Sequence, residues 1–255
     1  MAKILRSAIN KAVHTTGYHI TKLEKPLPAP AAPQKPKPPT APKKPDPKDY
    51  STMDNPQEVP CQKETYYFAL NNYVGPNDKV LDVGSGLGYG MNILSIKAKE
   101  VWGIDVDKKA VSYSKNELLG HNPKAKDILY FDGYRTPFKN NQFDVVTCVD
   151  VLEHVKEYDK FVDELLRISR KAVIFATPNR RPEYTNPDGT PRNYWHLREW
   201  NHKELDDILS KHAKVDWFFI DGKFEGPFKI NKQPSSRTLV LMPVLVKAKT
   251  TITKK

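Results

Sequence analysis

The pattern of apolar and polar residues changes near residue 57. From there to residue 246, short apolar runs alternate with segments whose apolar residues recur at helical spacing. This alternation is typical of a parallel sheet whose two faces are covered by helices. The apolar runs that predict strands are 79–84, 100–106, 127–133, 143–150, 171–177, 214–221 and 237–246. We therefore expect an α/β fold with a doubly wound, Rossmann-like sheet of seven strands.

Helices are expected between these strands. The segments with helical spacing are 62–74, 108–119 and about 157–169. A further helix is expected to start near Asn201, because Asn201 and Glu204 have the spacing of a capping box. We also expect a helix to begin near residue 150. Positions i, i+3 and i+4 of a helix are neighbours, so this helix would place Asp150, Glu153 and His154 on one face.

The first 50 residues follow a different pattern. Apolar residues recur at helical spacing between Ile4 and Val13, which predicts a basic amphipathic segment within residues 1–25. Ten of the 22 residues from Pro26 to Pro47 are proline, so residues 26–50 are expected to form an extended, Pro/Lys-rich linker. The predicted folded domain then spans residues 51–255.

The positive charge of the protein is concentrated in this N-terminal region. The chain carries a net charge of +11, and residues 1–50 contribute +7 of it, from nine Lys and one Arg against three acidic residues. Such a tail could bind a partner protein, an anionic membrane surface or nucleic acid, pack on its own domain, or serve as a transit peptide. A wholly basic domain, which would favour nucleic acid, is not present.

The chain has neither an apolar run of the roughly 18 residues that span a bilayer nor the apolar stretch of a signal peptide. Its two cysteines, Cys61 and Cys148, lack the spacing of metal ligands or of a disulfide framework. We therefore expect a cytoplasmic protein, tethered peripherally through its N-terminal segment.

A glycine-rich turn follows the first predicted strand. The segment LDVGSGLGYG contains Asp82, Gly84, Gly86 and Gly88, whose glycines let the backbone turn sharply and approach a ligand at the carboxyl edge of the sheet. The next three predicted strands end in Asp105, in the pair Asp132 and Gly133, and in Asp150. A carboxylate after the second strand can bind ribose hydroxyls. The loop lacks the Gly-Lys-Ser/Thr of a P-loop, which favours a cofactor with a ribose, an adenine and a charged amino acid over a pyrophosphate.

The segments VLDVGSGLGYG, VWGIDVD, FDGYRTPF, FDVVTCVDVLEHV and VIFATPN together resemble the class I S-adenosylmethionine (SAM) dependent methyltransferases. The resemblance implies a seven-stranded sheet whose last strand is antiparallel, and SAM as the cofactor. It also implies contacts of Asp82 and the glycine loop with the methionine moiety, of Asp105 with the ribose, of Asp132 and Gly133 with the adenine, and of Asp150 near the sulfonium. The cofactor-binding residues expected on this basis are Asp82, Gly84, Ser85, Gly86, Gly88, Asp105, Val106, Asp132, Gly133 and Asp150.

The methyl acceptor is expected to be an oxygen atom. The family's N-P-P-Y type motif for amino methylation is absent after the fourth strand, and Cys148 follows Thr147 rather than a proline, so no Pro-Cys pair serves a cytosine mechanism. We expect a small molecule, a sugar, or a glycan or lipid-linked acceptor. The alternatives are an RNA ribose methyltransferase whose Lys-rich tail contacts phosphates, and a structural subunit that binds SAM without turnover.

Two roles are open for the polar residues beside the acceptor. Asp150, Glu153, His154 and His196 resemble the metal ligands of the O-methyltransferases of ubiquinone biosynthesis and of the RNA 3′-terminal 2′-O-methyltransferases, which implies a Mg or Zn ion that lowers the pKa of the acceptor hydroxyl. Asp150 stands where those families have Glu. In the alternative there is no metal. Glu153 then orients the loop and His154 caps or packs, while His196 is either a general base acting alone or a lid residue that stacks beside Trp195 and Trp200. Further acceptor contacts are expected from the aromatic and basic residues Tyr184, Tyr194, Arg180 and Arg192.

Overall fold

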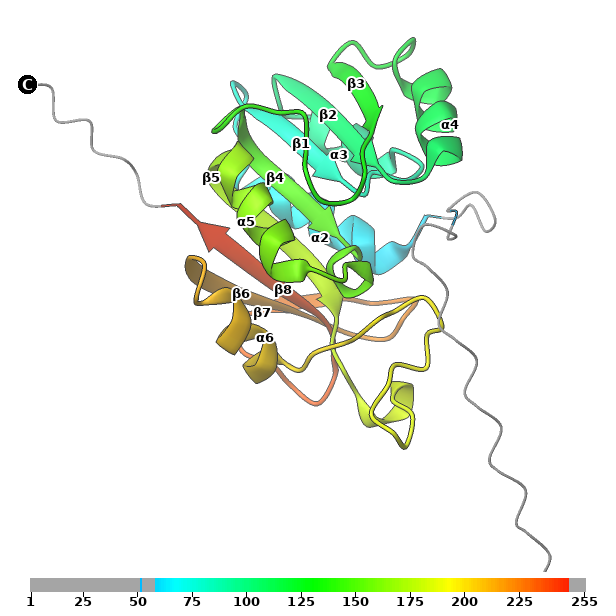
Figure 1. The fold of residues 1–255 in the computed structure, drawn as a ribbon, viewed down its shortest axis with the longest axis vertical. Helices are drawn as coiled ribbons and strands as arrows, with labels where there is room; N and C mark the ends of the chain where they lie inside the picture. The colour runs from blue at the N-terminus through cyan, green and yellow to red at the C-terminus, as the bar shows by residue number, and fades with distance from the viewer. Residues whose placement is uncertain (1–50, 52–57, 248–255) are drawn as a thin grey trace, which may run out of the picture. The chain divides into compact units, whose positions relative to one another are not determined.

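The computed structural model describes Ser51 and residues 58–247. The expectations for residues 1–50 lie outside the described residues, and the predicted domain boundaries stay predictions. Within the described part, one mixed sheet has the strand order β3-β2-β1-β4-β5-β8-β6-β7 (Figure 1). The strands are β1 (Lys79–Val83), β2 (Glu100–Asp105), β3 (Ala125–Tyr130), β4 (Phe143–Val149), β5 (Ser169–Pro178), β6 (Lys214–Asp221), β7 (Lys229–Asn231) and β8 (Thr238–Val246).

The strand directions confirm the predicted fold class. Strands β1 to β5 pair in parallel, whereas β8 is antiparallel to both β5 and β6, so the expected antiparallel last strand is present. The sheet has eight strands rather than seven, because the short β7 pairs with β6 at the edge. Three residues of sequence KIN are too few to show a strand periodicity.

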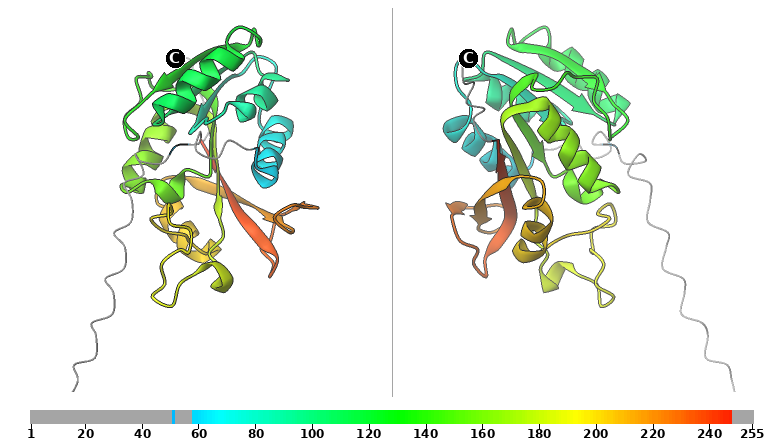
Figure 2. Two further views of the ribbon diagram at one scale, coloured as in Figure 1. Left: turned by 90° about the vertical axis from the view of Figure 1, so that its right-hand side faces the viewer. Right: turned by 60° about the vertical axis from the view of Figure 1, so that its left-hand side comes forward.

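Helices cover both faces of the sheet, as the left view of Figure 2 shows edge-on. One apolar cluster contains residues of α2, α3 and α4, and the other contains residues of α5 and α6. Neighbouring strand residues alternate between the two, so that Val80 belongs to the first cluster and Leu81 to the second. The helices are α2 (Pro60–Asn72), α3 (Tyr89–Ser95), α4 (Lys108–Leu118), α5 (Tyr158–Ile168) and α6 (His202–Leu209). Among the described residues, none of these is long and apolar enough to cross a membrane.

Two expectations about helix starts had different outcomes. The capping box of α6 is confirmed, with the Asn201 side chain accepting from the Glu204 backbone and the Glu204 side chain accepting from that of Asn201. The helix expected near residue 150 was wrong. Asp150 has a φ of 52°, outside the right-handed helical region, and only the 3₁₀ turn η3 (Leu152–His154) follows before α5.

A long segment between β5 and α6 lies beside the carboxyl ends of the parallel strands. Asn179 and Trp200 form a parallel bridge that joins the two ends of this segment, and the backbone N–H of Leu197 donates to the carbonyl of Glu153 at 3.0 Å. Within it lies the 3₁₀ turn η4 (Pro182–Tyr184). The segment 179–200, called the acceptor loop below, is thereby held against η3.

Candidate active site

The glycine loop after β1 folds tightly against β2. The backbone N–H groups of Gly84 and Ser85 both donate to the carbonyl of Ile104, at 2.8 and 3.1 Å. Gly84 has a φ of 72°, and a Cβ atom there would lie 2.3 Å from the Val151 side chain. Glycine at this position therefore meets both a backbone and a packing requirement.

Asp105 supports this loop from the end of β2. Its carboxylate accepts hydrogen bonds from the backbone N–H groups of Gly86 and Asp107, each at 2.8 Å. Burial raises the pKa of Asp105, and these hydrogen bonds oppose the rise because they favour the charged form. Asp105 thus ties the glycine loop to the second strand in addition to lining the cavity beside it.

Asp82 is fully buried beneath the loop. Thr147 donates to its carboxylate at 2.7 Å, and Tyr66 of α2 contacts both carboxylate oxygens at 3.2 Å. Burial raises the pKa of Asp82 to about 7, while the hydrogen bonds from Thr147 and Tyr66 act in the opposite direction. Tyr66, which lies in α2 16 residues before Asp82, was not predicted to contact the site.

Five of the predicted cofactor residues line one cavity at this edge of the sheet. Gly84, Asp105, Val106, Gly133 and Asp150 lie around it, together with Phe131, Phe161 and His154. Asp132 is exposed, and its side chain accepts from the backbone N–H groups of Tyr134 and Arg135 at 2.9 and 3.1 Å. It therefore shapes the turn that carries Gly133.

A second cavity of about 530 Å³ lies between α2 and the acceptor loop, within the usual size range of small-molecule sites. Its lining is mixed, with Val59, Cys61, Pro178, Phe224, Leu239 and Val240 supplying apolar surface and Gln62, Asn179, Arg181, Tyr184, Arg192, Asn193, His196 and Glu199 supplying polar groups. Of the residues that line the two cavities, Asp150 alone lines both. Of the four predicted acceptor contacts, Tyr184 and Arg192 belong to this lining. Arg180 instead pairs with Glu204 at 2.5 Å, and Tyr194 is exposed and packs edge-on against Trp195.

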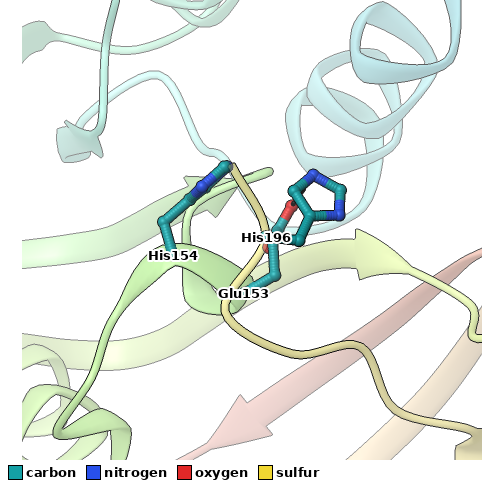
Figure 3. A group of neighbouring side chains, drawn as sticks. All are labelled: Glu153, His154 and His196. Carbon is teal, nitrogen blue, oxygen red and sulfur yellow. Dashed lines mark ion pairs between the residues drawn. The ribbon is translucent and has the colours of Figure 1, made fainter. Parts of the chain in front are cut away.

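Three potential metal ligands lie close together, namely Glu153, His154 and His196 (Figure 3). Glu153 and His154 come from η3 and His196 from the acceptor loop, and one potential ligand atom of each lies within 4.8 Å of the others. Glu153 is fully buried, with one oxygen accepting from Thr177 at 3.0 Å and the other, Oε1, without a hydrogen-bond partner. Burial, followed by the charge of Asp150, raises its pKa well above the usual range.

The hydrogen bonds of the two histidines define their tautomers. Nδ1 of His154 lies 3.0 Å from the carbonyl oxygen of Trp195, and Nδ1 of His196 lies 2.6 Å from Oε1 of Glu199. Both partners accept, so in the neutral rings Nδ1 carries the proton and Nε2 the lone pair. Nε2 of His196 accepts from Nδ2 of Asn193 at 3.0 Å, which agrees with this tautomer. Burial and the neighbouring His196 lower the pKa of His154 to about 4, so its ring is neutral at pH 7.

The structure therefore brings together three of the four predicted metal ligands. Asp150 lies apart from this group, and its carboxylate accepts from Nε2 of Gln62 at 2.5 Å. Burial raises the pKa of Asp150, and the Gln62 hydrogen bond and His196 oppose that rise. Besides Tyr66, two further site residues were missed from the sequence. Glu199 carried a usable signal, an acid three residues after His196, whereas Gln62 carried none.

Comparisons with known proteins bear on this arrangement. Residues 81–177 match the family described as methyltransferase domain. A probable S-adenosylmethionine-dependent methyltransferase of Mycobacterium tuberculosis is 31% identical over 154 residues, which cover 58% of this chain and 52% of the relative. A ubiquinone biosynthesis O-methyltransferase of Azoarcus is 34% identical over 104 residues, covering 40% and 45%. The chain thus spans about half the length of these curated relatives.

Solved structures agree on the fold. A SAM-dependent methyltransferase from Aquifex aeolicus superposes with a TM-score of 0.52 at 19% identity, covering 74% of this chain and 90% of that one. At this identity the likeness concerns the fold alone. The family match runs from Leu81 in β1 to Thr177 in β5, so α2 and the whole acceptor loop lie outside it.

Proposed function

The chain carries a class I SAM-dependent methyltransferase domain, and from this premise we propose that it transfers the methyl group of SAM to an oxygen atom of a small molecule, a sugar, or a glycan or lipid-linked acceptor. SAM would occupy the cavity of the glycine loop, and the acceptor the cavity under the acceptor loop. The role of Asp132 and Gly133 at the adenine, and of Asp105 and Val106 at the ribose, is part of the same proposal.

The observation that carries the proposal is the shared wall at Asp150. Methyl transfer from a sulfonium is an in-line displacement, so the acceptor atom must approach the methyl carbon from the side opposite the sulfur. The cofactor cavity and the second cavity share the lining residue Asp150, so an acceptor in the second cavity could approach the methyl group of SAM from the side opposite the sulfur. The methyl group would pass from one cavity to the other beside the Asp150 carboxylate.

An oxygen acceptor is supported by the pair His196 and Glu199. A hydroxyl must lose its proton during transfer, and the unprotonated Nε2 of a neutral His196 can take it. In the structure this nitrogen accepts from the Asn193 amide at 3.0 Å, so the acceptor hydroxyl would replace that amide as its partner. Glu199 holds Nδ1–H of His196 at 2.6 Å, which fixes the tautomer and would stabilise the imidazolium that forms, as the carboxylate of a catalytic triad does. We assign His196 the role of general base, with Glu153 and His154 packed behind it.

The cavity lining favours an acceptor with both apolar and polar parts. Apolar surface comes from both ends of the described chain, including Val59 before α2 and Leu239 and Val240 in β8. Polar groups come mainly from the acceptor loop, including Asn179 and Arg192. A sugar joined to a lipid, or a substituted aromatic ring, has this mixed chemistry.

A second candidate role for the same side chains is metal binding. Oε1 of Glu153 is buried without a hydrogen-bond partner, and both histidines make the second hydrogen bond through Nδ1 that metal-ligating histidines make. A metal at Nε2 of His196 would displace the Asn193 amide, which donates to that nitrogen at 3.0 Å. The three residues therefore fit a divalent ion, and a His₂Glu set suits Zn²⁺ better than Mg²⁺, which prefers oxygen ligands. Such an ion would supply a Lewis acid that lowers the pKa of the acceptor hydroxyl.

The proposal is tested by two measurements on the purified full chain. Calorimetric titration with SAM should show binding, and incubation with methyl-labelled SAM and fractionated lysate should label one small-molecule or glycan fraction. Label stable to mild acid but lost with cleavage of an ether or ester would place the methyl group on oxygen.

Repeating the incubation with a chelator separates the two roles of His196. Unchanged labelling supports the general base, and labelling lost on chelation and restored by Zn²⁺ supports the metal. Binding of SAM without label in any fraction would contradict catalysis and indicate a structural subunit. Label confined to RNA would indicate a ribose methyltransferase.

A further inference from the structure

Helix α2 reaches the wall between the two cavities. Gln62 and Tyr66 lie one turn apart on α2, so their side chains project from the same face. Tyr66 contacts the Asp82 carboxylate in β1, and Gln62 donates to the Asp150 carboxylate directly after β4. One helix outside the family-matched residues thereby touches two carboxylates at the carboxyl edge of the sheet.

The orientation of the Gln62 amide is fixed by its two partners. Asp150 offers only acceptor oxygens when ionised, so the amide nitrogen must face it. On the other side, the hydroxyl of Tyr89 donates to Oε1 of Gln62. Tyr89 is the first residue of α3, directly after the glycine loop. The chain Tyr89, Gln62, Asp150 therefore runs from the glycine loop to the cavity wall.

The backbone of Asp150 is also held in one position. Its φ of 52° is uncommon for a residue with a side chain, and such a conformation persists where the surroundings determine it. The backbone N–H of Asp150 donates to the carbonyl of Ala176 in β5 at 2.9 Å. The backbone is thus fixed by β5, and the carboxylate by Gln62 at 2.5 Å.

We propose that Gln62 is a positioning residue that holds the Asp150 carboxylate at the cavity wall, facing the sulfonium of bound SAM. The inference rests on the proposed function, because it takes the cavity of the glycine loop as the cofactor site. A carboxylate attracts the positively charged sulfonium of SAM, and it has no such attraction for the neutral thioether of S-adenosylhomocysteine. Gln62 would therefore influence which of the two ligands the protein prefers.

The test compares the two dissociation constants, which requires no knowledge of the acceptor. Kd for SAM and Kd for S-adenosylhomocysteine are measured by calorimetry on the full chain, for the wild type and for Gln62→Leu, which keeps the side-chain bulk and removes both hydrogen-bonding groups. We expect the ratio of Kd for SAM to Kd for S-adenosylhomocysteine to rise about three- to tenfold in the variant, since hydrogen bonds to charged groups are among the stronger ones.

Gln142→Leu is the matched control. Gln142 precedes β4, whereas Asp150 follows it, so the same change is made at the opposite edge of the sheet, where the Gln142 side chain only accepts from the Lys139 backbone. The ratio should stay as in the wild type. Tyr89→Phe, which leaves Gln62 in place but removes its orienting hydroxyl, should raise the ratio in the same direction by a smaller factor.

The outcomes separate this inference from the proposed function. If the wild type binds neither ligand, the proposed function fails. If the wild type binds SAM and the ratio is unchanged in a Gln62→Leu variant with a wild-type melting temperature, the positioning role of Gln62 is overturned. If Gln62→Leu does not fold, Tyr89→Phe decides, and an unchanged ratio in that variant overturns the role.

Discussion

The glycine loop takes its shape from backbone hydrogen bonds to the next strand of the sheet, whereas the second cavity is assembled from the side chains of segments far apart in the chain. Gly84, Ser85 and Gly86 contact Ile104 and Asp105 on the adjacent strand. The second cavity combines α2, the acceptor loop and β8. Backbone geometry thus determines the shape of the glycine loop, whereas the packing of side chains determines the shape of the second cavity, and Asp150 borders both.

This difference suggests that cofactor binding and acceptor chemistry can be damaged separately. Substitutions in the glycine loop should weaken SAM binding and stability, and substitutions in the acceptor loop should lower turnover with SAM binding intact. The following changes test that separation.

The largest effect is expected from His196→Ala. Loss of a general base typically lowers a rate by about 10²–10⁴-fold, so label transfer should fall by that factor while Kd for SAM changes by less than about twofold. The measurement is labelled transfer to the lysate fraction that the wild type modifies. His121→Ala is the control, since His121 is exposed at the end of α4. Wild-type transfer by His196→Ala would show that His196 has no chemical role.

Gly84→Ala should destabilise the fold by roughly 2–5 kcal/mol, because a positive φ and a close approach to Val151 both penalise a Cβ atom. Gly189→Ala is a matched control. Gly189 also has a positive φ, of 83°, but no atom lies within 4 Å of its added Cβ. It should lose only about 1–2 kcal/mol. Chemical denaturation of both variants gives the difference, and equal losses would show that contact with Val151 is unimportant.

Asp105→Asn should weaken SAM binding by about ten- to thirtyfold, because the variant replaces a charged acceptor of two backbone N–H groups and of the proposed ribose contact. Calorimetry with SAM measures the loss. Asp127→Asn serves as the control, since Asp127 in β3 forms a partly exposed ion pair with Lys115. Similar losses in both variants would remove Asp105 from the cofactor site.

The smallest effect is expected in the pH dependence of stability. The pKa of Asp82 is raised to about 7 in the folded protein, mainly by burial, against about 3.9 in an unfolded chain. Between these values the folded form holds a proton that the unfolded form releases, so the free energy of unfolding falls as pH rises through this window and levels off above about 7. The Asp82→Asn variant has no titrating carboxyl group at this position, so its stability should lack this pH dependence.

The melting temperature of the cofactor-free wild type should therefore decline between pH 5 and pH 7 by a few degrees more than that of Asp82→Asn. Thr147→Val provides a further comparison. It removes a hydrogen bond that favours the ionised carboxylate, so the decline should continue to a higher pH. Parallel curves for the wild type and Asp82→Asn would indicate that Asp82 titrates normally.

The sequence was informative where neighbours along the chain decide the structure. The seven predicted strands, the α6 capping box and the glycine loop followed from local patterns. The capping box satisfies backbone N–H groups, and the loop glycines adopt positive φ angles. The helix expected at residue 150 was wrong because the apolar spacing carried no sign of the positive φ of Asp150. The gathering of His196 with Glu153 and His154 was predicted from a resemblance. Gln62 was missed because its partner Asp150 lies far away in the sequence, whereas Glu199 was missed although it lies only three residues after its partner His196.

The bridge between Asn179 and Trp200 has a consequence for how this protein can diversify. The bridge brings both ends of the acceptor loop together, so the intervening chain can be exchanged for another length at little entropic cost of closure. Replacement of the part of the loop before His196 would change the lining contributed by Tyr184, Arg192 and Asn193 while leaving His196, Glu199, Asp82 and Asp105 in place. Changes in the loop could therefore alter which acceptors the protein binds, in evolution or by engineering, without changing the residues proposed to bind the cofactor.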